Sequence, residues 1–433
     1  MKPLSQARGP AMQHQHPLSG RLLRWLIWGG AAFMMLVLPL VFSSGFAIAL
    51  LSQMGIMIIF ALSFNMLLGQ TGLLSFGHAV YSGLGGFIAA HTLNMIGEGL
   101  PLPVSLLPLV GGLGGMLFGV LFGYVTTRKS GTTFAMITLG IGEMVAASSL
   151  MIQEFFGGEA GIATNRTVGH TVFGITYGPP IQVYYLIAVW CLASMVAMYA
   201  FTQTPLGRIA NAVRDNAERA EFIGYNTQRV RYLVMILSAF FAGIAGGLSV
   251  INFEIVTSEN VGAAQSGGVL LATFIGGGEF FFGPIIGSII YVLFAVALSG
   301  LTPAWLLYLG IFFVLIVMYI PGGISSVLMK QRPLIAARRL HCLLLSYAAV
   351  LVAGLIVVAA LVLTVELVYK LRIGGGDSTT MTLVGVGFDA ASWMAWAVAA
   401  VLWVLGALAG LAAASRVGHA WDRVHREIQG GNA

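Results

Sequence analysis

The stretch FAIALLSQMGIMIIFALSFNMLL, from Phe46 to Leu68, decides the fold class, because it has the length of a membrane span and contains no charged residue. A membrane-spanning α-helix needs about 20 mostly apolar residues, since a hydrocarbon core of roughly 30 Å is crossed at about 1.5 Å per residue. Of the 433 residues of the chain, 58% are hydrophobic and 8% are charged, whereas a soluble domain has roughly 25% charged residues. The sequence therefore predicts an all-α, polytopic transmembrane helical bundle.

Further apolar segments supply the remaining predicted spans. They are 22–42, 73–90, 102–125, 134–151, 183–201, 232–250, 269–275, 280–298, 303–320, 342–363 and 391–414. The prediction is about ten core spans within a transmembrane domain at 21–330, preceded by a polar N-terminal tail at 1–20. A C-terminal extension at 331–433 adds a pair of spans.

One predicted segment, 269–275, is too short to cross a bilayer alone, and it ends at three successive glycines, Gly276, Gly277 and Gly278. Non-helical backbone at membrane depth survives only where protein or a water-filled cavity covers it. The segment is therefore either half of a broken span or a re-entrant loop, and these glycines are candidates for lining a transport path. A tight turn at the membrane interface remains the alternative.

Basic residues in short loops mark the cytoplasmic side of a membrane protein. They form clusters at Arg21 and Arg24, at Arg128 and Lys129, and in the ranges 208–231, 330–339 and 416–426. An even number of predicted spans separates each cluster from the next, so all of them fall on one side and both termini are expected in the cytoplasm. Lys370 and Arg372 are the exception. The net charge of +6 thus reports topology and the bilayer, not a nucleic-acid partner.

The segment TPLGRIANAVRDNAERAEFIGYNTQRVR, at 204–231, is the one long charged interruption of the apolar runs. Thr204 before Pro205 is a helix-start signal, and a second start is expected near Asp215 and Glu218. Gly224 suits a C-terminal cap. The pattern predicts two short amphipathic helices that dock a soluble partner, with a solvated loop of balanced charge as the alternative.

Two polar residues are predicted at membrane depth. Glu143 interrupts an apolar span, and an ionisable group there should face the bundle interior or a wet cavity. It is either a residue of the transport path or a buried structural carboxyl. His78 is more often a packed polar residue than a substrate contact in such a setting.

Enzymatic chemistry is not expected. The nearest approach to a phosphate-binding loop, at 123–130, carries Arg128 where its second glycine must stand. Neither a paired-carboxylate set, a metal-ligand cluster nor a cofactor motif is present in the sequence, and Cys191 and Cys342 both lie inside apolar runs.

Four segments resemble the permease subunits of branched-chain amino acid ABC importers, of the type that pairs with a second, related permease. The first, from Ala61, matches at Asn65, Gly69, Gly72, Leu73, Ser75, Gly77 and His78; the second at Gly157, Gly158, Gly161 and Ile162; the third at Gly207, Arg208, Arg214, Asn216, Ala220 and Gly224; and the fourth at Gly276, Gly277, Gly283, Pro284 and Gly287. The resemblance covers roughly 46–328, and the extension after Arg332 has no counterpart in it.

The resemblance implies a subunit of an importer in the bacterial inner membrane, driven by ATP hydrolysis on two separate ATPase subunits and fed by a periplasmic solute-binding protein. It makes 204–231 the ATPase-coupling segment, with Gly207, Arg208, Arg214, Asp215, Asn216, Glu218, Ala220 and Gly224 as its candidate residues. The candidate path residues are Asn65, Ser75, His78, Glu143, Gly157, Gly158 and Gly276 to Gly278. The substrate stays open among branched-chain amino acids, urea, amides and other small acids. Alternatives are an ion-coupled secondary transporter of about twelve spans and a channel or scaffold.

Overall fold

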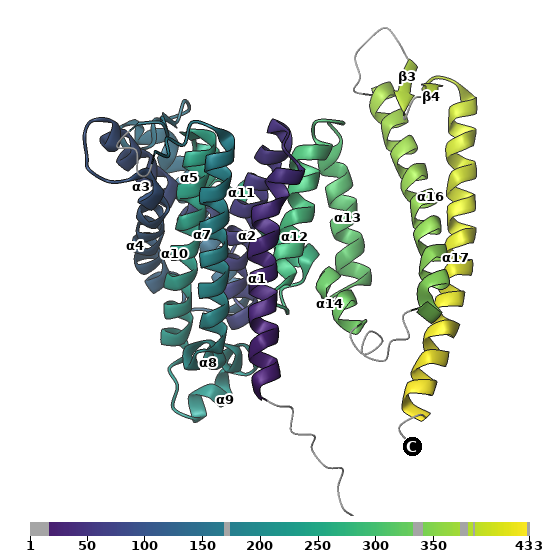
Figure 1. Ribbon diagram of the computed structural model, residues 1–433, viewed down its shortest axis with the longest axis horizontal. Coiled ribbons are helices and arrows are strands. Elements are labelled where there is room, and N and C mark those ends of the chain that lie inside the picture. The colour runs from purple at the N-terminus through teal and green to yellow at the C-terminus, as the bar shows by residue number, and fades with distance from the viewer. Residues whose placement is uncertain (1–16, 169–173, 332–340, 373–379, 384–385, 431–433) are drawn as a thin grey trace, which may run out of the picture. The chain divides into compact units, whose positions relative to one another are not determined.

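The computed structural model describes residues 17–168, 174–331, 341–372, 380–383 and 386–430, and almost all of its regular structure is helical (Figure 1). The longer helices are α1 (Pro17–Val41), α2 (Gly45–Thr71), α3 (Ala79–Gly97), α4 (Leu107–Thr126), α5 (Gly131–Met151), α7 (Pro180–Gln203), α10 (Thr227–Phe253), α11 (Ala263–Gly276), α13 (Trp305–Tyr319), α16 (His341–Arg372) and α17 (Trp393–Gly430). Shorter helical elements are η1 (Val104–Leu106), α6 (Gln153–Phe156), α8 (Pro205–Asp215), α9 (Ala217–Phe222), η2 (Ser258–Val261), α12 (Gly283–Val292), η3 (Leu293–Leu298) and α14 (Gly323–Lys330).

Within the described residues, seven helices are long and apolar enough to cross a membrane, or eight if the bent pair α13 and α14 forms one span. The all-α polytopic fold is therefore confirmed. Of the expected N-terminal tail, 1–16 lies outside the described residues, and α1 begins at Pro17. Most of the basic cluster at 330–339 also lies outside them, and the cluster at 416–426 falls within α17.

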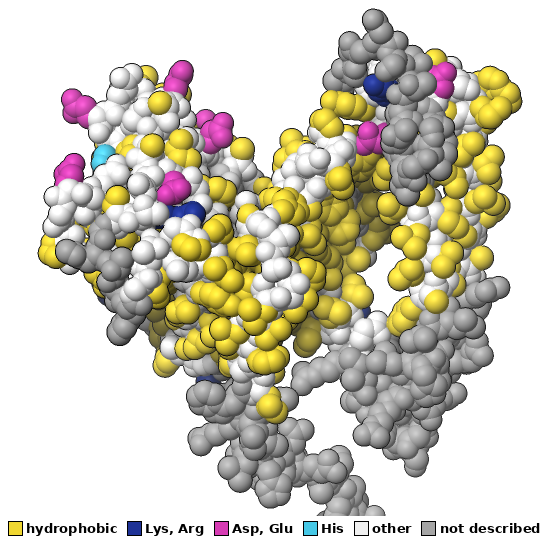
Figure 2. Space-filling view, turned by 45° about the horizontal axis from the view of Figure 1, so that its top comes forward, with side chains coloured by type: hydrophobic (Ala, Val, Ile, Leu, Met, Phe, Trp, Pro, Cys, Tyr) yellow, Lys and Arg dark blue, Asp and Glu magenta, His cyan; other side chains and the backbone are white. Residues whose placement is uncertain are grey.

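The chain divides into two compact units. The larger contains Met1–Thr273 with Gly287–Val292, and the smaller contains Phe274–Ile286 with Leu293–Ala433. Figure 2 shows acidic side chains gathered at one end of the larger unit, above a surface that is mostly apolar. The two units are described separately.

The core of the larger unit is built around α10, whose apolar window is 83% buried. We call the contact of α10 with α3 and α4 the glycine seam, defined by Gly85, Gly111, Gly115, Gly243 and Gly247. A Cβ added to Gly115 would lie 2.4 Å from the carbonyl oxygen of Ala239, and one added to Gly243 would lie 2.2 Å from that of Gly111. Only glycine fits there, and the backbones of these helices touch directly, as small residues allow in membrane bundles.

The span expected at 73–90 differs from the structure. Helix α2 ends at Thr71, its capping residue Gly72 has a left-handed backbone (φ 69°), and α3 does not begin until Ala79. Residues 72–78, here called the re-entrant strand, are non-helical and contain the fully buried side chains of Ser75 and His78. The composition of this stretch is as apolar as that of a membrane helix, but contacts with distant parts of the chain hold its backbone in a non-helical conformation.

The re-entrant strand packs against α5. The backbone N–H of Phe76 donates a hydrogen bond to Thr138 Oγ1 at 3.2 Å, and a Cβ on Gly77 would lie 2.1 Å from the carbonyl oxygen of Thr138. Protein therefore covers this irregular backbone on the α5 side, which is the condition under which it can exist in a membrane protein.

At the end of the larger unit opposite α8 and α9, two short strands pair antiparallel, β1 (Ile162–Ala163) with β2 (Ile255–Val256). Arg166 joins the loops there. Its guanidinium donates hydrogen bonds to the carbonyl oxygens of Tyr177, Gly178, Ile251 and Asn252. This end of the bundle is therefore tied together through one side chain.

The predicted glycine break lies between α11 and α12. Helix α11 has 14 residues, about 21 Å at 1.5 Å per residue, which is too short for a bilayer. It ends at Gly276, and Gly277 has φ 99°, with a Cβ position 2.1 Å from the carbonyl oxygen of Gly322 in the same unit. The sequence 263–298 thus forms short helices separated by a break.

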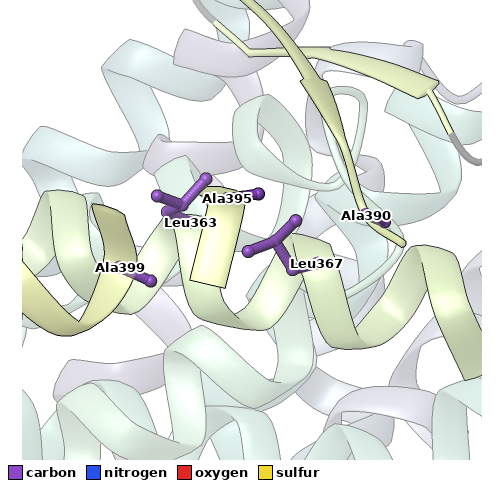
Figure 3. Close-up of a cluster of buried hydrophobic side chains, with 5 residues drawn as sticks. All are labelled: Leu363, Leu367, Ala390, Ala395 and Ala399. Atoms are coloured by element: carbon purple, nitrogen blue, oxygen red, sulfur yellow. The ribbon is translucent and has the colours of Figure 1, made fainter. Parts of the chain in front are cut away.

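The C-terminal extension forms a helical hairpin of α16 and α17, joined at the strands β3 (Thr380–Leu383) and β4 (Val386–Asp389). Its small core contains Leu363, Leu367, Ala390, Ala395 and Ala399 (Figure 3). In the same unit, Glu366 of α16 accepts hydrogen bonds from Thr302 Oγ1 at 2.7 Å and from Tyr308 Oη at 3.1 Å. A carboxylate therefore attaches the extension to α13 and the residues before it.

Candidate functional site

Helices α8 and α9 form the predicted pair of short helices between the spans α7 and α10. Thr204 caps α8, since its Oγ1 accepts a hydrogen bond from the backbone N–H of Gly207 at 3.2 Å. Asn216 caps α9 by accepting from the N–H of Arg219 at 2.9 Å, whereas the sequence placed this start at Asp215, which is the last residue of α8. Gly224 follows α9 with φ 96°, as expected for a helix end.

Arg214 connects α8 to the end of α2. Its Nη1 donates a short hydrogen bond to the carbonyl oxygen of Gly69, and its Nη2 lies 2.9 Å from Asp215 Oδ1. Its Cγ lies 3.1 Å from the position that a Cβ on Gly72 would occupy. The guanidinium thus contacts the last turn of α2 beside the start of the re-entrant strand.

The other predicted residues of the segment divide into inward and outward groups. Gly207 and Ala220 are buried, and a Cβ on Gly207 would lie 2.4 Å from the carbonyl oxygen of Phe201. Arg208 and Glu218 are exposed. The first group shapes the segment, and the second is accessible to another molecule.

Sequence reasoning missed the most exposed apolar residues of the segment. Phe222 is 91% exposed and Ile223 is 70% exposed, at the end of α9. For Phe222 the signal was present, because Ala217 and Ala220 define the apolar face of α9 and Phe222, two residues after Ala220, does not continue their spacing. Large apolar side chains left in water beside charged residues mark a contact surface for another protein or a membrane.

His78 lies in a fully buried polar site within the larger unit. Ser63 Oγ donates to the carbonyl oxygen of Phe60 at 2.7 Å and lies 2.9 Å from His78 Nε2. Because the serine proton is already used, His78 Nε2 must be the donor, and Nδ1 is then a bare acceptor. Nδ1 has no hydrogen-bond partner among the described residues.

Two other polar side chains of the same region also lack hydrogen-bond partners among the described residues. Asn65 Oδ1 and Ser75 Oγ are buried and make no hydrogen bond within the described part of the chain. Buried polar atoms are normally satisfied, so each such atom calls for a water, an ion or a ligand group. The α2 end and the re-entrant strand therefore contain several polar atoms with unused capacity.

Glu143 does not face the interior of this chain. Its side chain is exposed on α5, on a face with Met136, Gly140 and Ala147, and it makes no hydrogen bond or ion pair to a described residue. Another face of α5 contacts the re-entrant strand, since a Cβ added to Gly142 would lie 3.4 Å from the Cα of Gly77. One helix thus connects the re-entrant strand with an outward carboxylate.

The remaining path candidates lie elsewhere. Gly157 and Gly158 follow α6 with φ 74° and 65°, at the end of the larger unit opposite α8 and α9. Gly276 to Gly278 belong to the smaller unit and lie at the break after α11.

A polytopic helical bundle, with buried non-helical backbone and a two-helix polar segment inserted between long spans, is the architecture of a multi-pass membrane protein. A family model for the permease component of branched-chain amino acid transport systems matches residues 46–321. The chain belongs to this family, and it is therefore a multi-pass membrane protein of ABC transport.

Individual relatives agree with the family model. The chain is 28% identical over 297 residues to the high-affinity branched-chain amino acid transport system permease protein LivM of Escherichia coli K12, covering 64% of this chain and 69% of that protein. The protein of the same description from Salmonella typhimurium is equally similar. A probable branched-chain amino acid transport permease protein LivM of Methanocaldococcus jannaschii is 24% identical over 334 residues, covering 65% of this chain and 92% of that protein. No solved structure matches the chain significantly.

Proposed function

We propose that this chain is the membrane-spanning subunit of an ATP-driven importer that moves branched-chain amino acids, or similar small polar solutes, across the bacterial inner membrane. The observation that carries the proposal is the segment α8–α9, which presents Phe222 and Ile223 to solvent while Arg214 joins it to α2. A channel or a scaffold has no need of such a segment.

The exposed end of α9 is the proposed docking site for an ATPase subunit. Burying an apolar side chain of this size contributes about 1.5 to 3 kcal/mol, so Phe222 and Ile223 together supply enough for a specific contact. Glu218 and Arg219, both exposed, lie four and three residues before Phe222 on the same helix, so charge of both signs lies beside it. ATP hydrolysis would take place on the partner, because this chain carries no phosphate-binding loop.

A displacement of α8 by the ATPase subunit would be transmitted to α2 through Arg214. The carbonyl oxygen that Arg214 contacts belongs to Gly69, three residues before the re-entrant strand begins. That strand contacts α5 at Thr138 and Gly142. A displacement of α8 therefore reaches, by successive contacts, the buried polar site at His78 and the helix that carries Glu143.

The transport path is proposed to follow this route. An ionised carboxylate facing lipid at mid-span costs about 2.5 to 3.5 kcal/mol on insertion scales, so the exposed face of α5 is better suited to water or to protein. We assign that cover to the second, related permease subunit, with Glu143 at the boundary. In the same unit, Asn65, Ser75 and His78, with the backbone of Gly157 and Gly158, are the proposed residues of the path; Gly276 to Gly278 stay a separate proposal within the smaller unit.

The distribution of charged residues between the two ends of the larger unit suggests how the chain is oriented in the membrane. The α8–α9 end carries Arg128, Lys129 and the arginines of 208–231, whereas carboxylates gather at the opposite end of the larger unit (Figure 2). By the positive-inside rule, this distribution supports a cytoplasmic location for α8 and α9, and we propose the same side for both chain termini. A periplasmic solute-binding protein would then meet the other end, with 21–330 as the permease domain and 331–433 as an appended hairpin.

The test is uptake into proteoliposomes containing this chain, its related permease and two ATPase subunits, with the solute-binding protein added outside. Uptake of labelled leucine should require ATP and the binding protein, and should persist when ionophores abolish the ion gradients. Uptake that continues without ATP and stops with the ionophores would replace this proposal with an ion-coupled secondary transporter.

A further inference from the structure

A polar cavity of about 600 Å³ lies at the C-terminal end of the coupling segment, between the end of α4 and the start of α10. Arg128 and Arg231 line it from the two spans, together with Glu221, Tyr225, Asn226 and Gln228. The proposed importer activity uses none of these side chains for transport. The cavity is therefore available for a separate ligand.

The chemistry of the lining favours an anion. Arg231 is half-buried, and its Nε is a buried donor without a partner among the described residues. Such a donor seeks an acceptor oxygen, and the planar fork of a guanidinium fits a phosphate in two-point contact. The one carboxylate in the lining, Glu221, accepts a hydrogen bond from Thr227 Oγ1 at 2.7 Å. Its single negative charge is outweighed by the two arginines of the lining.

The position of the cavity at the ends of two spans is the position expected of a lipid-headgroup site. Arg128 follows the last residue of α4 by two positions, and Arg231 lies in the first turns of α10, so both are at the same end of their spans. The guanidinium of Arg128 lies over the ring of Tyr124, 4.5 Å from its centroid. Tyrosine and arginine at the end of an apolar helix are typical of the membrane interface.

An apolar stripe on α4 leads to the cavity. Leu113, Leu117, Leu121 and Val125 recur every four residues and are each more than half exposed, so they form one outward line along the helix. Arg128 follows one turn later. A free phosphate would use the cavity alone, whereas a phospholipid would use both the cavity and the stripe.

We propose that this cavity binds the phosphate of an anionic phospholipid from the leaflet on the α8–α9 side, with an acyl chain along the α4 stripe. Basic pockets between spans on the cytoplasmic side are the usual sites for such headgroups. Because Glu221 belongs to α9 and Thr227 begins α10, the bound lipid adjoins the contact that holds the coupling segment to its span.

Lipid binding to the full-length chain tests the proposal directly. The purified chain is delipidated in neutral detergent, and its affinity for phosphatidylglycerol, phosphatidylcholine and inorganic phosphate is measured by native mass spectrometry. Wild-type protein should bind phosphatidylglycerol at least tenfold more tightly than phosphatidylcholine, and should not retain inorganic phosphate. Arg128→Gln and Arg231→Gln should each weaken phosphatidylglycerol binding at least fivefold.

Two further variants make the result specific. Arg229→Gln loses the same charge on the same helix but lies outside the cavity lining, and it should change the affinity less than twofold. Glu221→Gln removes the negative charge from the lining and should tighten phosphatidylglycerol binding, a gain that misfolding cannot mimic. An equal loss in Arg229→Gln and Arg231→Gln, or inorganic phosphate that binds as well as the lipid, would overturn the proposal.

Discussion

Arg214→Gln should separate ATP hydrolysis from transport. In the wild type, the Arg214 guanidinium spans from α8 to the carbonyl oxygen of Gly69 in the last turn of α2. Glutamine is shorter and uncharged, so it cannot maintain this contact. Phe222 and Ile223 stay exposed, so docking of the ATPase subunit should be preserved.

The size of the effect follows from the lost hydrogen bond. A hydrogen bond from a charged donor contributes about 1.5 to 3 kcal/mol, which corresponds to a factor of about 10 to 150 in the equilibrium that keeps α8 and α2 together. The ion pair with Asp215 adds little, because the Asp215 side chain is 67% exposed and exposed pairs contribute about 0 to 1 kcal/mol. We therefore expect at least a tenfold fall in solute transported per ATP hydrolysed.

The assay measures leucine uptake and phosphate release in the same proteoliposomes, so that their ratio is obtained directly. The matched control is Arg208→Gln, which removes the same charge from the same helix at an exposed position and should keep the ratio within twofold of wild type. A ratio for Arg214→Gln within twofold of wild type would refute the reasoning, as would an equal loss in the control.

Three further predictions concern packing, docking and the path. Gly115→Ala should lower the thermal unfolding midpoint in detergent by several degrees, since its Cβ would lie 2.4 Å from a carbonyl oxygen and overpacking costs about 1 to 3 kcal/mol. Gly140→Ala, with no atom within 4 Å of the new Cβ, should leave the midpoint unchanged or raise it, and a reversed order would contradict the glycine seam. Phe222→Ser with Ile223→Ser should weaken ATPase binding at least tenfold in a pull-down titration, while Phe253→Ser, partly exposed at the opposite end of α10, should not; equal losses would move the docking site elsewhere. Glu143→Gln should reduce uptake at least tenfold with complex assembly intact, and Glu143→Asp should recover part of it; normal uptake by Glu143→Gln would remove this residue from the path.

The membrane fold was predictable because its main signal is local. The apolar runs at 46–68, 183–201 and 232–250 lie within the helices α2, α7 and α10, which extend beyond them at both ends. The two helices of the coupling segment followed equally from local signals at Thr204 and Gly224. By contrast, the re-entrant strand is as apolar as a helix, and it is open because Gly77 touches Thr138, far away in the sequence.

The candidate site was harder to predict for the same reason. That Arg214 reaches Gly69 depends on how α8 packs on the spans, which its own spacing does not encode. The outward direction of Glu143 likewise depends on which face of α5 meets the re-entrant strand. The family resemblance identified these positions, and the structure separates those that shape the segment from those that a partner can reach.

The glycine seam has a consequence for how such a protein can move. Where helix backbones meet directly, no flexible side chains lie between them that could rearrange as the helices shift. We therefore expect α3, α4 and α10 to move as one rigid body. We therefore expect any rearrangement during a transport cycle to involve the elements outside this seam, among them the re-entrant strand and α5. The glycines of the seam thereby define the part of the larger unit that we expect to stay rigid.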